Sequence, residues 1–464
     1  MSQSWEIENF LEANDHRLHI DGVDTVELVR EYGSPLFVFS ERRIRRNIER
    51  LKRVADVIEC PLKLCYAAKA MSTLGILRAV KDADCDVEVN SGGELWKALK
   101  AGFVGSQIIF NGTSKEVWEL ELAVTNDIYA IQVDSIFELL LIEETAARLG
   151  KCANVSLRLV PEISSDTHSG LQTALLTSKF GMMPEEAYDA VRKHANSPRI
   201  NICGVHLHIG SQNPEPKVYA EAFKTLFSSL LRIFNETGQT LGHINLGGGF
   251  PVRYLKDDAA GLDPKQRAML AADFEPADAI EPAWIAVQRA AQEAGSEALL
   301  SGLTLLLEPG RSIIADAGIC LTTVRNTKAR PTANGGTDHW LLTDAGFNIL
   351  LSMETYKWYY HLISAERADS DHDLDYKVAG PLCDGGDVYF DIEGEGRLPE
   401  HRGLPENVEA GEVLALLNCG AYSLAQASQY NARFLPPVVL IKLDGTPSLI
   451  RRRDNFEDLI SSDL

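Results

Sequence analysis

Side chains able to do cofactor chemistry stand at the ends of short apolar runs in this chain. Lys69 follows the run Leu62–Ala68, and a lysine flanked by small residues can form a Schiff base with a carbonyl group. Glu88, near the end of the next run, would tune the charge of that lysine from across the site. A lysine after a strand is also an ordinary surface lysine, so Lys69 alone indicates no site.

Two histidines alternate within the run Ile202–Ile209, which predicts that His206 and His208 lie on one face of a strand. Two histidines could bind a metal, but no third ligand with supporting spacing is evident. His208 is instead suited to lie flat against a planar ring, with the Ser211 hydroxyl beyond it available to a phosphate. Both histidines fit equally well as core side chains with polar neighbours.

Three successive glycines close the run that begins at His243. The backbone N–H groups of Gly247, Gly248 and Gly249 carry no side chains that would hinder an anion, so they form a candidate phosphate cradle. Turns use glycine as well, and a glycine run is only a weak signal by itself. Its position directly after a strand strengthens it.

The last run of this series, Leu303–Glu308, ends in a carboxylate. Glu308 could accept a hydrogen bond from a protonated ring nitrogen, and Gly310 with Arg311 could complete a phosphate site. The same tetrapeptide also fits a Pro-Gly turn with a surface ion pair. Considered together, the lysine, the stacking histidine, the phosphate cradle and the carboxylate match one ligand, pyridoxal phosphate.

Alternating strands and helices must position these groups. Eight β-rich runs separated by amphipathic helical stretches predict parallel βαβ units and a (β/α)8 barrel, in which the strand ends face the active site. A doubly wound parallel sheet is the alternative. The runs are Leu62–Ala68, Cys85–Asn90, Gln107–Asn111, Ala130–Asp134, Val155–Val160, Ile202–Ile209, His243–Gly247 and Leu303–Glu308.

Strand-like runs with fewer helices follow Arg311 and predict a second, β-rich domain of sandwich or barrel type. We place the barrel at residues 46–312 and the β-rich domain at 1–45 and 313–464, with Pro35–Ser40 pairing into it. The predicted strands are Gly318–Val324, Trp340–Thr343, Asp375–Val378, Val388–Ile392, Val413–Leu417 and Val438–Lys442.

The composition narrows the class of protein. Of 464 residues, 45 are Lys or Arg and 66 are Asp or Glu, and a net charge of −21 disfavours nucleic acid and anionic membranes as partners. No signal peptide or apolar run of membrane-spanning length is visible, and the eight cysteines form no CxxC pair. We therefore expect a cytoplasmic protein with free thiols.

The chain resembles the fold-type III pyridoxal-phosphate decarboxylases, which act on diaminopimelate, ornithine, arginine or lysine and share their barrel with alanine racemases. The resemblance covers nearly the whole chain. Its motifs are Tyr66–Ala70, Ser91–Leu95, Ser178–Gly181, His206–Gln212, Gly247–Pro251, Glu308–Ser312, Asp344–Gly346, Cys383–Asp387, Gly420–Tyr422 and Tyr430–Arg433.

The resemblance implies roles for individual residues. Lys69 would bind the cofactor covalently, His208 would stack on its ring and Glu308 would pair with the ring nitrogen. The phosphate would be held by Ser211, Gly249, Gly310 and Tyr422, with Arg311 close by. Such enzymes are homodimers with shared sites, to which the partner would contribute Cys383 as proton donor and Asp384 as a substrate contact. A buried structural thiol is the alternative for Cys383.

Three departures from the diaminopimelate enzymes bear on the substrate. Ser352 aligns with their carboxylate-binding arginine, Asp384 stands where they tend to carry glutamate, and Glu88 where an aspartate is common. These differences resemble a branch that includes bacterial D-ornithine/D-lysine decarboxylase. Ser165–His168 and the aromatic stretch Tyr356–Tyr360 also look like that branch. Tyr356, Arg311 and Tyr422 are further candidate substrate contacts.

The sequence thus predicts a decarboxylase that acts on a basic or diamino acid of the lysine or ornithine type. The substrate carbon that loses the carboxyl group could be D-configured. The alternatives are meso-diaminopimelate decarboxylation to L-lysine and decarboxylation of an amino-acid conjugate. A racemase is disfavoured because the Cys383 segment and the long β domain match decarboxylases. A non-enzymatic cofactor carrier is disfavoured because such carriers lack the β domain.

Overall fold

The computed structural model describes residues 4–160, 178–257 and 259–464. Contacts within the chain divide it into two compact units. The barrel unit comprises residues 45–251 and 272–313, and the β-rich unit comprises residues 1–44, 252–271 and 314–464. The chain passes from the second unit to the first within helix α2 (Glu41–Lys52).

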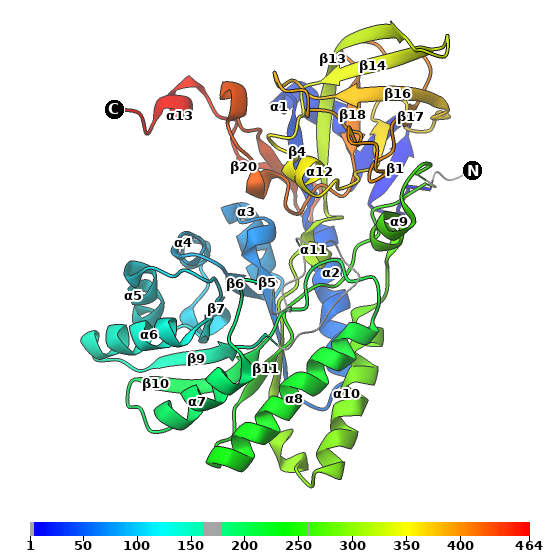
Figure 1. The fold of residues 1–464 in the computed structure, drawn as a ribbon. Coiled ribbons are helices and arrows are strands. Elements are labelled where there is room, and N and C mark those ends of the chain that lie inside the picture. Colours follow the sequence, from blue (N-terminus) through cyan, green and yellow to red (C-terminus); the bar gives the residue numbers. More distant parts are fainter. Residues whose placement is uncertain (1–3, 161–177, 258) are drawn as a thin grey trace. The chain divides into compact units, whose positions relative to one another are not determined.

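Eight parallel strands close the barrel in the order β10-β11-β12-β5-β6-β7-β8-β9 (Figure 1). Each predicted run overlaps one of them, so the predicted (β/α)8 barrel is confirmed. The strands are β5 (Leu62–Ala67), β6 (Asp86–Val89), β7 (Ile108–Phe110), β8 (Ala130–Val133), β9 (Ala153–Arg158), β10 (Ile200–His206), β11 (His243–Asn245) and β12 (Thr304–Leu307).

Helices of the barrel unit follow the strands, and short polar residues begin two of them. The Ser91 hydroxyl accepts a hydrogen bond from the Glu94 amide, and the Ser135 hydroxyl accepts one from the Glu138 amide, so each caps a helix N-terminus. The helices are α3 (Leu74–Lys81), α4 (Gly92–Ala101), α5 (Val117–Thr125), α6 (Ile136–Arg148), α7 (Pro184–His194), α8 (Lys217–Thr237), α10 (Pro276–Glu293) and the short α11 (Arg311–Ile314).

A nine-stranded sheet dominates the β-rich unit. Its main path is β17-β16-β14-β13-β4-β19-β20, and β18 pairs with both β13 and β15. The strands are β4 (Leu36–Ser40), β13 (Gly318–Pro331), β14 (Thr337–Thr343), β15 (Leu362–Ser364), β16 (Leu374–Ala379), β17 (Arg402–Leu404), β18 (Val413–Leu416), β19 (Val438–Ile441) and β20 (Pro447–Arg451). A small sheet precedes them, formed by β1 (Leu11–Asn14), β2 (Arg17–Ile20) and β3 (Val23–Asp24). The remaining helices are α1 (Thr25–Tyr32), α9 (Pro264–Ala271), α12 (Leu351–Thr355) and α13 (Phe456–Ile460).

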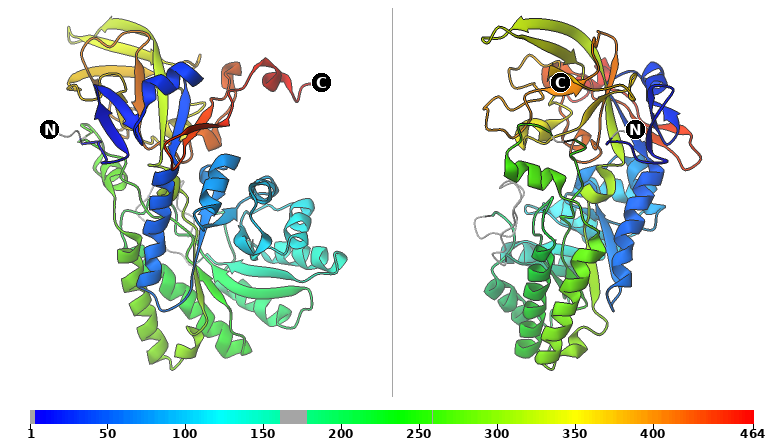
Figure 2. Two further views of the ribbon diagram at one scale, coloured as in Figure 1. Left: turned by 180° about the vertical axis from the view of Figure 1, so that it is seen from behind. Right: turned by 90° about the vertical axis from the view of Figure 1, so that its right-hand side faces the viewer.

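Both chain ends contribute to the β-rich unit, as the run Pro35–Ser40 predicted. Strand β4 pairs antiparallel with β13 and parallel with β19, and Leu18, Val38, Ile319 and Val439 share one buried apolar cluster. Figure 2 shows the N-terminal strands beside the later strands of this unit. The pairing of β4 therefore joins segments that are about 280 and 400 residues apart in sequence.

Two details differ from the sequence-based expectation. Val388–Ile392 is not a strand, because only Val388 makes an isolated bridge, to Ala379, and turns follow. Residues 252–271, expected in the barrel, belong to the β-rich unit. There the Asn418 side chain donates to the Arg253 carbonyl (2.9 Å) and the Asp263 amide donates to the Gly396 carbonyl (2.7 Å). No helix among the described residues is both long and apolar enough to cross a lipid bilayer.

Candidate functional site

The first and last strands of the barrel place Lys69 and Glu308 at the same end. Lys69 lies in a short 3-10 turn, Ala68–Ala70, directly after β5, and its side chain is exposed. The Ala67 amide donates to the Pro309 carbonyl (3.0 Å), which joins the ends of β5 and β12. A Cβ atom on Gly310 would lie 3.1 Å from the Ala67 Cβ, so this close approach favours glycine.

Two asparagines connect the carboxylates of this site. The Asn111 Nδ2 group donates to Glu88 Oε1 and to Glu308 Oε2, each at 3.0 Å. The Asn245 Nδ2 group donates to the other Glu308 oxygen, Oε1, at 2.6 Å. These residues come from or directly follow strands β6, β7, β11 and β12, and all four are buried. Glu308 is therefore held from two sides.

Burial raises the pKa of Glu308 to about 7, and the nearby negative charge of Glu88 adds to this rise. The hydrogen bond from Asn245 and the positive charges of Lys69 and Arg158 act in the opposite direction. Glu308 thus titrates near neutral pH in the protein without ligand. A buried carboxylate of this kind suits a positively charged ligand group, which would restore its ionised form.

Both candidate histidines are neutral. Burial lowers the pKa of His206 and of His208 well below the usual value, and positive charges nearby, Arg158 and Lys69 among them, lower both further. The Gly248 amide donates to His208 Nδ1 (3.2 Å), so the ring proton sits on Nε2. Strand β10 ends at His206, so His208 lies in the loop beyond it and not on the strand face that the alternation predicted.

The glycine loop Gly247–Gly249 is close-packed against the barrel. The Gly247 amide donates to Asn245 Oδ1 (2.8 Å) and the Gly248 amide donates to His208, so two of the three N–H groups expected for an anion already have acceptors within the protein. Gly249 has a φ of 97°, and a Cβ atom there would lie 2.4 Å from Asn213 Nδ2. The loop therefore needs glycine for conformation and packing as well as for access.

The remaining phosphate candidates of the barrel unit lie together. Arg311 begins α11 and its Nε donates to the Ser211 hydroxyl at 3.1 Å. Arg311 is buried and so brings a positive charge to this end of the barrel. The structure thus joins Ser211 and Arg311, which are 100 residues apart in sequence.

The predicted proton donor Cys383 belongs to the β-rich unit and is exposed, which excludes the alternative of a buried structural thiol in the single chain. Its backbone amide donates to Asn431 Oδ1 (2.7 Å). Cys383 lines a cavity of about 960 Å³ within this unit, together with Arg433 and Arg453. Asp384 is also exposed, and Tyr430 donates to its Oδ2 at 3.2 Å.

Ser352, Tyr356 and Tyr422 also lie in the β-rich unit. The Ser352 hydroxyl is within hydrogen-bond distance of the Tyr422 carbonyl (3.0 Å) and of Gln426 Oε1 (3.1 Å), and Tyr356 ends helix α12. Tyr422 has a φ of 56°, a conformation uncommon for tyrosine. The stretch Ser165–His168, which carried part of the resemblance, lies outside the described residues.

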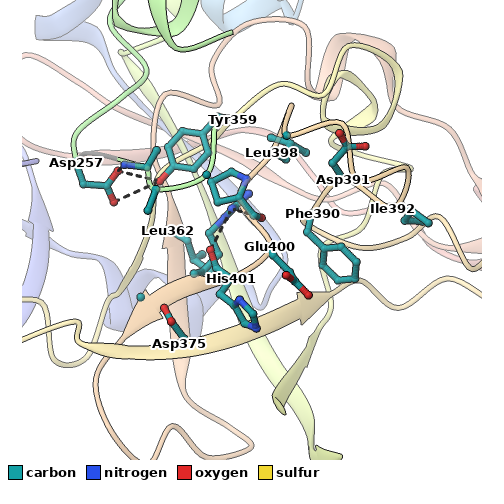
Figure 3. Close-up of a pocket in the computed structure, with 18 residues that line it drawn as sticks. Asp257, Tyr359, Leu362, Asp375, Phe390, Asp391, Ile392, Leu398, Glu400 and His401 are labelled. Atoms are coloured by element: carbon teal, nitrogen blue, oxygen red, sulfur yellow. Dashed lines mark hydrogen bonds between the residues drawn. The ribbon is translucent and has the colours of Figure 1, made fainter. Parts of the chain in front are cut away.

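A second cavity of the β-rich unit, about 830 Å³, contains none of the predicted site residues (Figure 3). Carboxylates line it, and the Tyr359 hydroxyl donates to Asp257 at 3.4 Å. Arg402, which also lines the cavity, is buried over the Tyr359 ring at 4.8 Å and donates to the Pro399 carbonyl at 3.1 Å. Since Arg402 is bonded to backbone carbonyls, its role is to hold this loop.

Unpartnered polar atoms test whether the barrel end fits pyridoxal phosphate. Among the described residues, Glu88 Oε2 and His206 Nδ1 are buried without a hydrogen-bond partner. Buried polar atoms normally have partners, so these atoms leave hydrogen bonds for a polar ligand. The donor set fits the cofactor: a lysine for its aldehyde, a carboxylate for its ring nitrogen, and Ser211 with Arg311 for its phosphate.

Sequence reasoning missed three polar residues of this site. Asn111 and Asn245 follow or end barrel strands, and Arg158 ends β9, buried and 4.2 Å from the Phe180 ring centre. Each stands at a strand end, so the rule that identified Lys69 and Glu308 could have found them. They were missed because an asparagine or arginine has no distinctive motif around it.

Comparisons with known proteins agree with this geometry. Residues 41–315 match the family model for the pyridoxal-dependent decarboxylases, pyridoxal binding domain. The diaminopimelate decarboxylase of Methanocaldococcus jannaschii is 34% identical over 460 residues, which cover 98% of this chain and 96% of that protein. The diaminopimelate decarboxylase of Aquifex aeolicus is 30% identical, over 99% of this chain and 98% of that protein.

Solved structures give the same result. The crystal structure of the M. jannaschii enzyme in complex with L-lysine superposes with a TM-score of 0.83 at 33% identity and covers 98% of both chains. The lysine decarboxylase of Selenomonas ruminantium reaches a TM-score of 0.72 at 22% identity, over 91% of this chain and 97% of that one. The second likeness supports the fold alone.

Proposed function

Because the chain belongs to the pyridoxal-dependent decarboxylase family, we propose that it removes one carboxyl group of meso-diaminopimelate as carbon dioxide and releases L-lysine. The observation that carries this proposal is the similarity to diaminopimelate decarboxylases along 98% of the chain. The sequence alone favoured a lysine or ornithine type of substrate. The comparisons support the diaminopimelate alternative better, since the structural likeness to a lysine decarboxylase has only 22% identity.

When bound, pyridoxal phosphate supplies a ring that accepts the electron pair left as carbon dioxide departs. Lys69 would hold the cofactor through its amine. His208, fixed by the Gly248 amide, presents a neutral ring to the cofactor. Glu308, fixed by two asparagines, would accept a hydrogen bond from the protonated ring nitrogen.

The phosphate is assigned to Ser211, Gly249, Gly310 and Tyr422, with Arg311 supplying positive charge and Gly247 and Gly248 shaping the loop. The contact between Arg311 and Ser211 supports this assignment, because it places a cation beside a hydroxyl donor. A local cation of this kind allows a chain with a net charge of −21 to bind an anionic cofactor.

Cys383 is assigned as the group that returns a proton to the substrate carbon, in a homodimer whose partner chain supplies it. Its exposure in the single chain supports this role, because a thiol that serves a neighbouring site must be accessible. Asp384 and Tyr356 are assigned to the substrate. All eight cysteines are unpaired, which fits the reducing cytoplasm that we propose as its location.

A lysine- or ornithine-type substrate remains the second candidate because of Ser352. By the resemblance, this position aligns with an arginine of the diaminopimelate enzymes. Here the Ser352 hydroxyl lies between the Tyr422 carbonyl and Gln426, which offer no positive charge for a distal carboxylate. A substrate with an ammonium at its far end would need no such charge.

Release of carbon dioxide tests the two candidates. The holoenzyme is assayed with meso-diaminopimelate and with both enantiomers of lysine, ornithine and arginine, with Lys69→Ala as the control that cannot hold the cofactor through an amine. We expect turnover of meso-diaminopimelate with L-lysine as product. Turnover of a D- or L-diamino acid with none of meso-diaminopimelate would refute the proposal and support the second candidate.

A further inference from the structure

We propose that Asn111 is a positioning residue that ties the Glu88 and Glu308 carboxylates together and keeps Glu308 charged as the partner of the cofactor ring nitrogen. The inference rests on the proposed function and extends it, because Asn111 touches neither the substrate nor the reacting atoms in the scheme above. Asn111 directly follows β7 and is buried, with 4% of its surface exposed.

The geometry of the Asn111 amide carries the inference. An amide NH2 group has two N–H donors, and here one serves Glu88 Oε1 and the other Glu308 Oε2, both at 3.0 Å. The two acceptors come from different strands, β6 and the end of β12. One side chain therefore bridges two buried carboxylates that repel each other.

The charge balance gives the bridge its purpose. Burial raises the pKa of Glu308 to about 7, and the nearby charge of Glu88 adds to this rise, so both favour protonation of Glu308. Hydrogen bonds donated to a carboxylate favour its charged form. Removal of the Asn111 donors would therefore raise the pKa of Glu308 further, and a neutral Glu308 is a poor partner for a protonated ring nitrogen.

The loop after β7 holds Asn111 rigidly. The backbone N–H group of Asn111 donates to the Val89 carbonyl (2.7 Å), and the Lys115 ammonium donates to the Gly112 carbonyl (2.7 Å). Gly112 has a φ of 111°, and a Cβ atom there would lie 2.7 Å from the Asn90 carbonyl oxygen. A fixed backbone on both sides holds the side-chain amide of Asn111 in one orientation, as a positioning residue requires.

The test is the affinity for pyridoxal phosphate as a function of pH, measured by absorbance titration of the full-length apoenzyme. Affinity falls as pH decreases through the pKa of Glu308. In Asn111→Leu, which removes both donors at similar volume, we expect the dissociation constant at pH 7 to rise about fivefold, because the ionised fraction of Glu308 falls from about one half to about one tenth. We expect the midpoint of the pH dependence to move up by about one unit.

Two further variants keep the result interpretable. Asn111→Asp has the same shape and, when protonated, can donate to only one carboxylate, so its midpoint should also move up. Gln132→Leu is the matched control, because Gln132 is a buried amide on the neighbouring strand β8 whose side-chain nitrogen and oxygen have no hydrogen-bond partner among the described residues. Its midpoint should equal that of the wild type. Thermal unfolding of each apoenzyme shows which variants are folded.

Wild-type affinity and midpoint in a folded Asn111→Leu or Asn111→Asp would overturn the proposal. An equal shift in Gln132→Leu would also overturn it, since the effect would then belong to the barrel interior in general. The readout does not depend on the substrate. A shifted midpoint without turnover of meso-diaminopimelate would therefore refute the proposed function and leave the role of Asn111 intact.

Discussion

Replacing Glu308 by glutamine should make the stability of the apoenzyme less dependent on pH, so that the variant gains on the wild type between pH 5 and pH 8. Burial and Glu88 raise the pKa of Glu308 from 4.5 to about 7, so the folded protein holds a proton on this group that the unfolded chain has already lost. The stability that this proton contributes is complete below pH 4.5 and is lost as pH rises through about 7. At about 1.4 kcal/mol per pKa unit, the loss is about 3 kcal/mol.

Glutamine cannot ionise and therefore avoids that loss. Its amide offers one acceptor oxygen, whereas Glu308 accepts hydrogen bonds from both Asn111 and Asn245, so the variant loses one of these bonds by a similar amount at every pH. The difference in free energy of unfolding between the variant and the wild type should then change in favour of the variant by about 2–3 kcal/mol between pH 5 and pH 8.

Urea unfolding of both apoenzymes at pH 5, 6, 7 and 8, followed by circular dichroism, measures this difference. The two compact units can unfold in separate transitions, so the barrel transition is identified by its response to added pyridoxal phosphate. Saturating cofactor should reverse the order and make the wild type more stable. A difference between the two apoenzymes that stays constant from pH 5 to pH 8 would refute the raised pKa and the reasoning built on it.

Three other changes test separate parts of the molecule. Lys115→Met should lower the free energy of unfolding, measured in urea, by about 3–5 kcal/mol. It leaves the buried Glu138 carboxylate, which lies 2.7 Å from the ammonium, without its partner. A loss below about 1 kcal/mol would contradict this. Cys383→Ala should slow product formation at least about tenfold without changing cofactor affinity. Cys152 is also exposed, and Cys152→Ala should change neither quantity. Weaker cofactor binding with normal turnover in Cys383→Ala would argue against the proton-donor role. Gly249→Ala should weaken cofactor binding at least about tenfold in absorbance titration. A Cβ atom there would lie 2.4 Å from Asn213 Nδ2 and 2.5 Å from the Gly210 carbonyl oxygen. Wild-type affinity would show that the loop adapts.

Pattern-based prediction succeeded for the barrel because each strand is a short apolar run followed by a helix with its own start signal. Ser91 and Ser135, for example, cap helices directly after strands β6 and β8. It failed at Val388–Ile392, where apolar and aromatic residues fill a loop and the propensity for strand is overridden by turns. It also could not assign residues 252–271 to the β-rich unit, because that depends on contacts with segments more than 100 residues away.

By itself, the sequence determined the types of chemical group at the strand ends and their order along the chain, and this was sufficient to indicate the cofactor. Only the tertiary structure decided how those groups act on one another. Barrel closure brings β6, β7, β11 and β12 together, so that Glu88, Asn111, Asn245 and Glu308 form one buried network. The pKa of Glu308 follows from that network, because desolvation and charge repulsion depend on distance in space and not on position in the sequence.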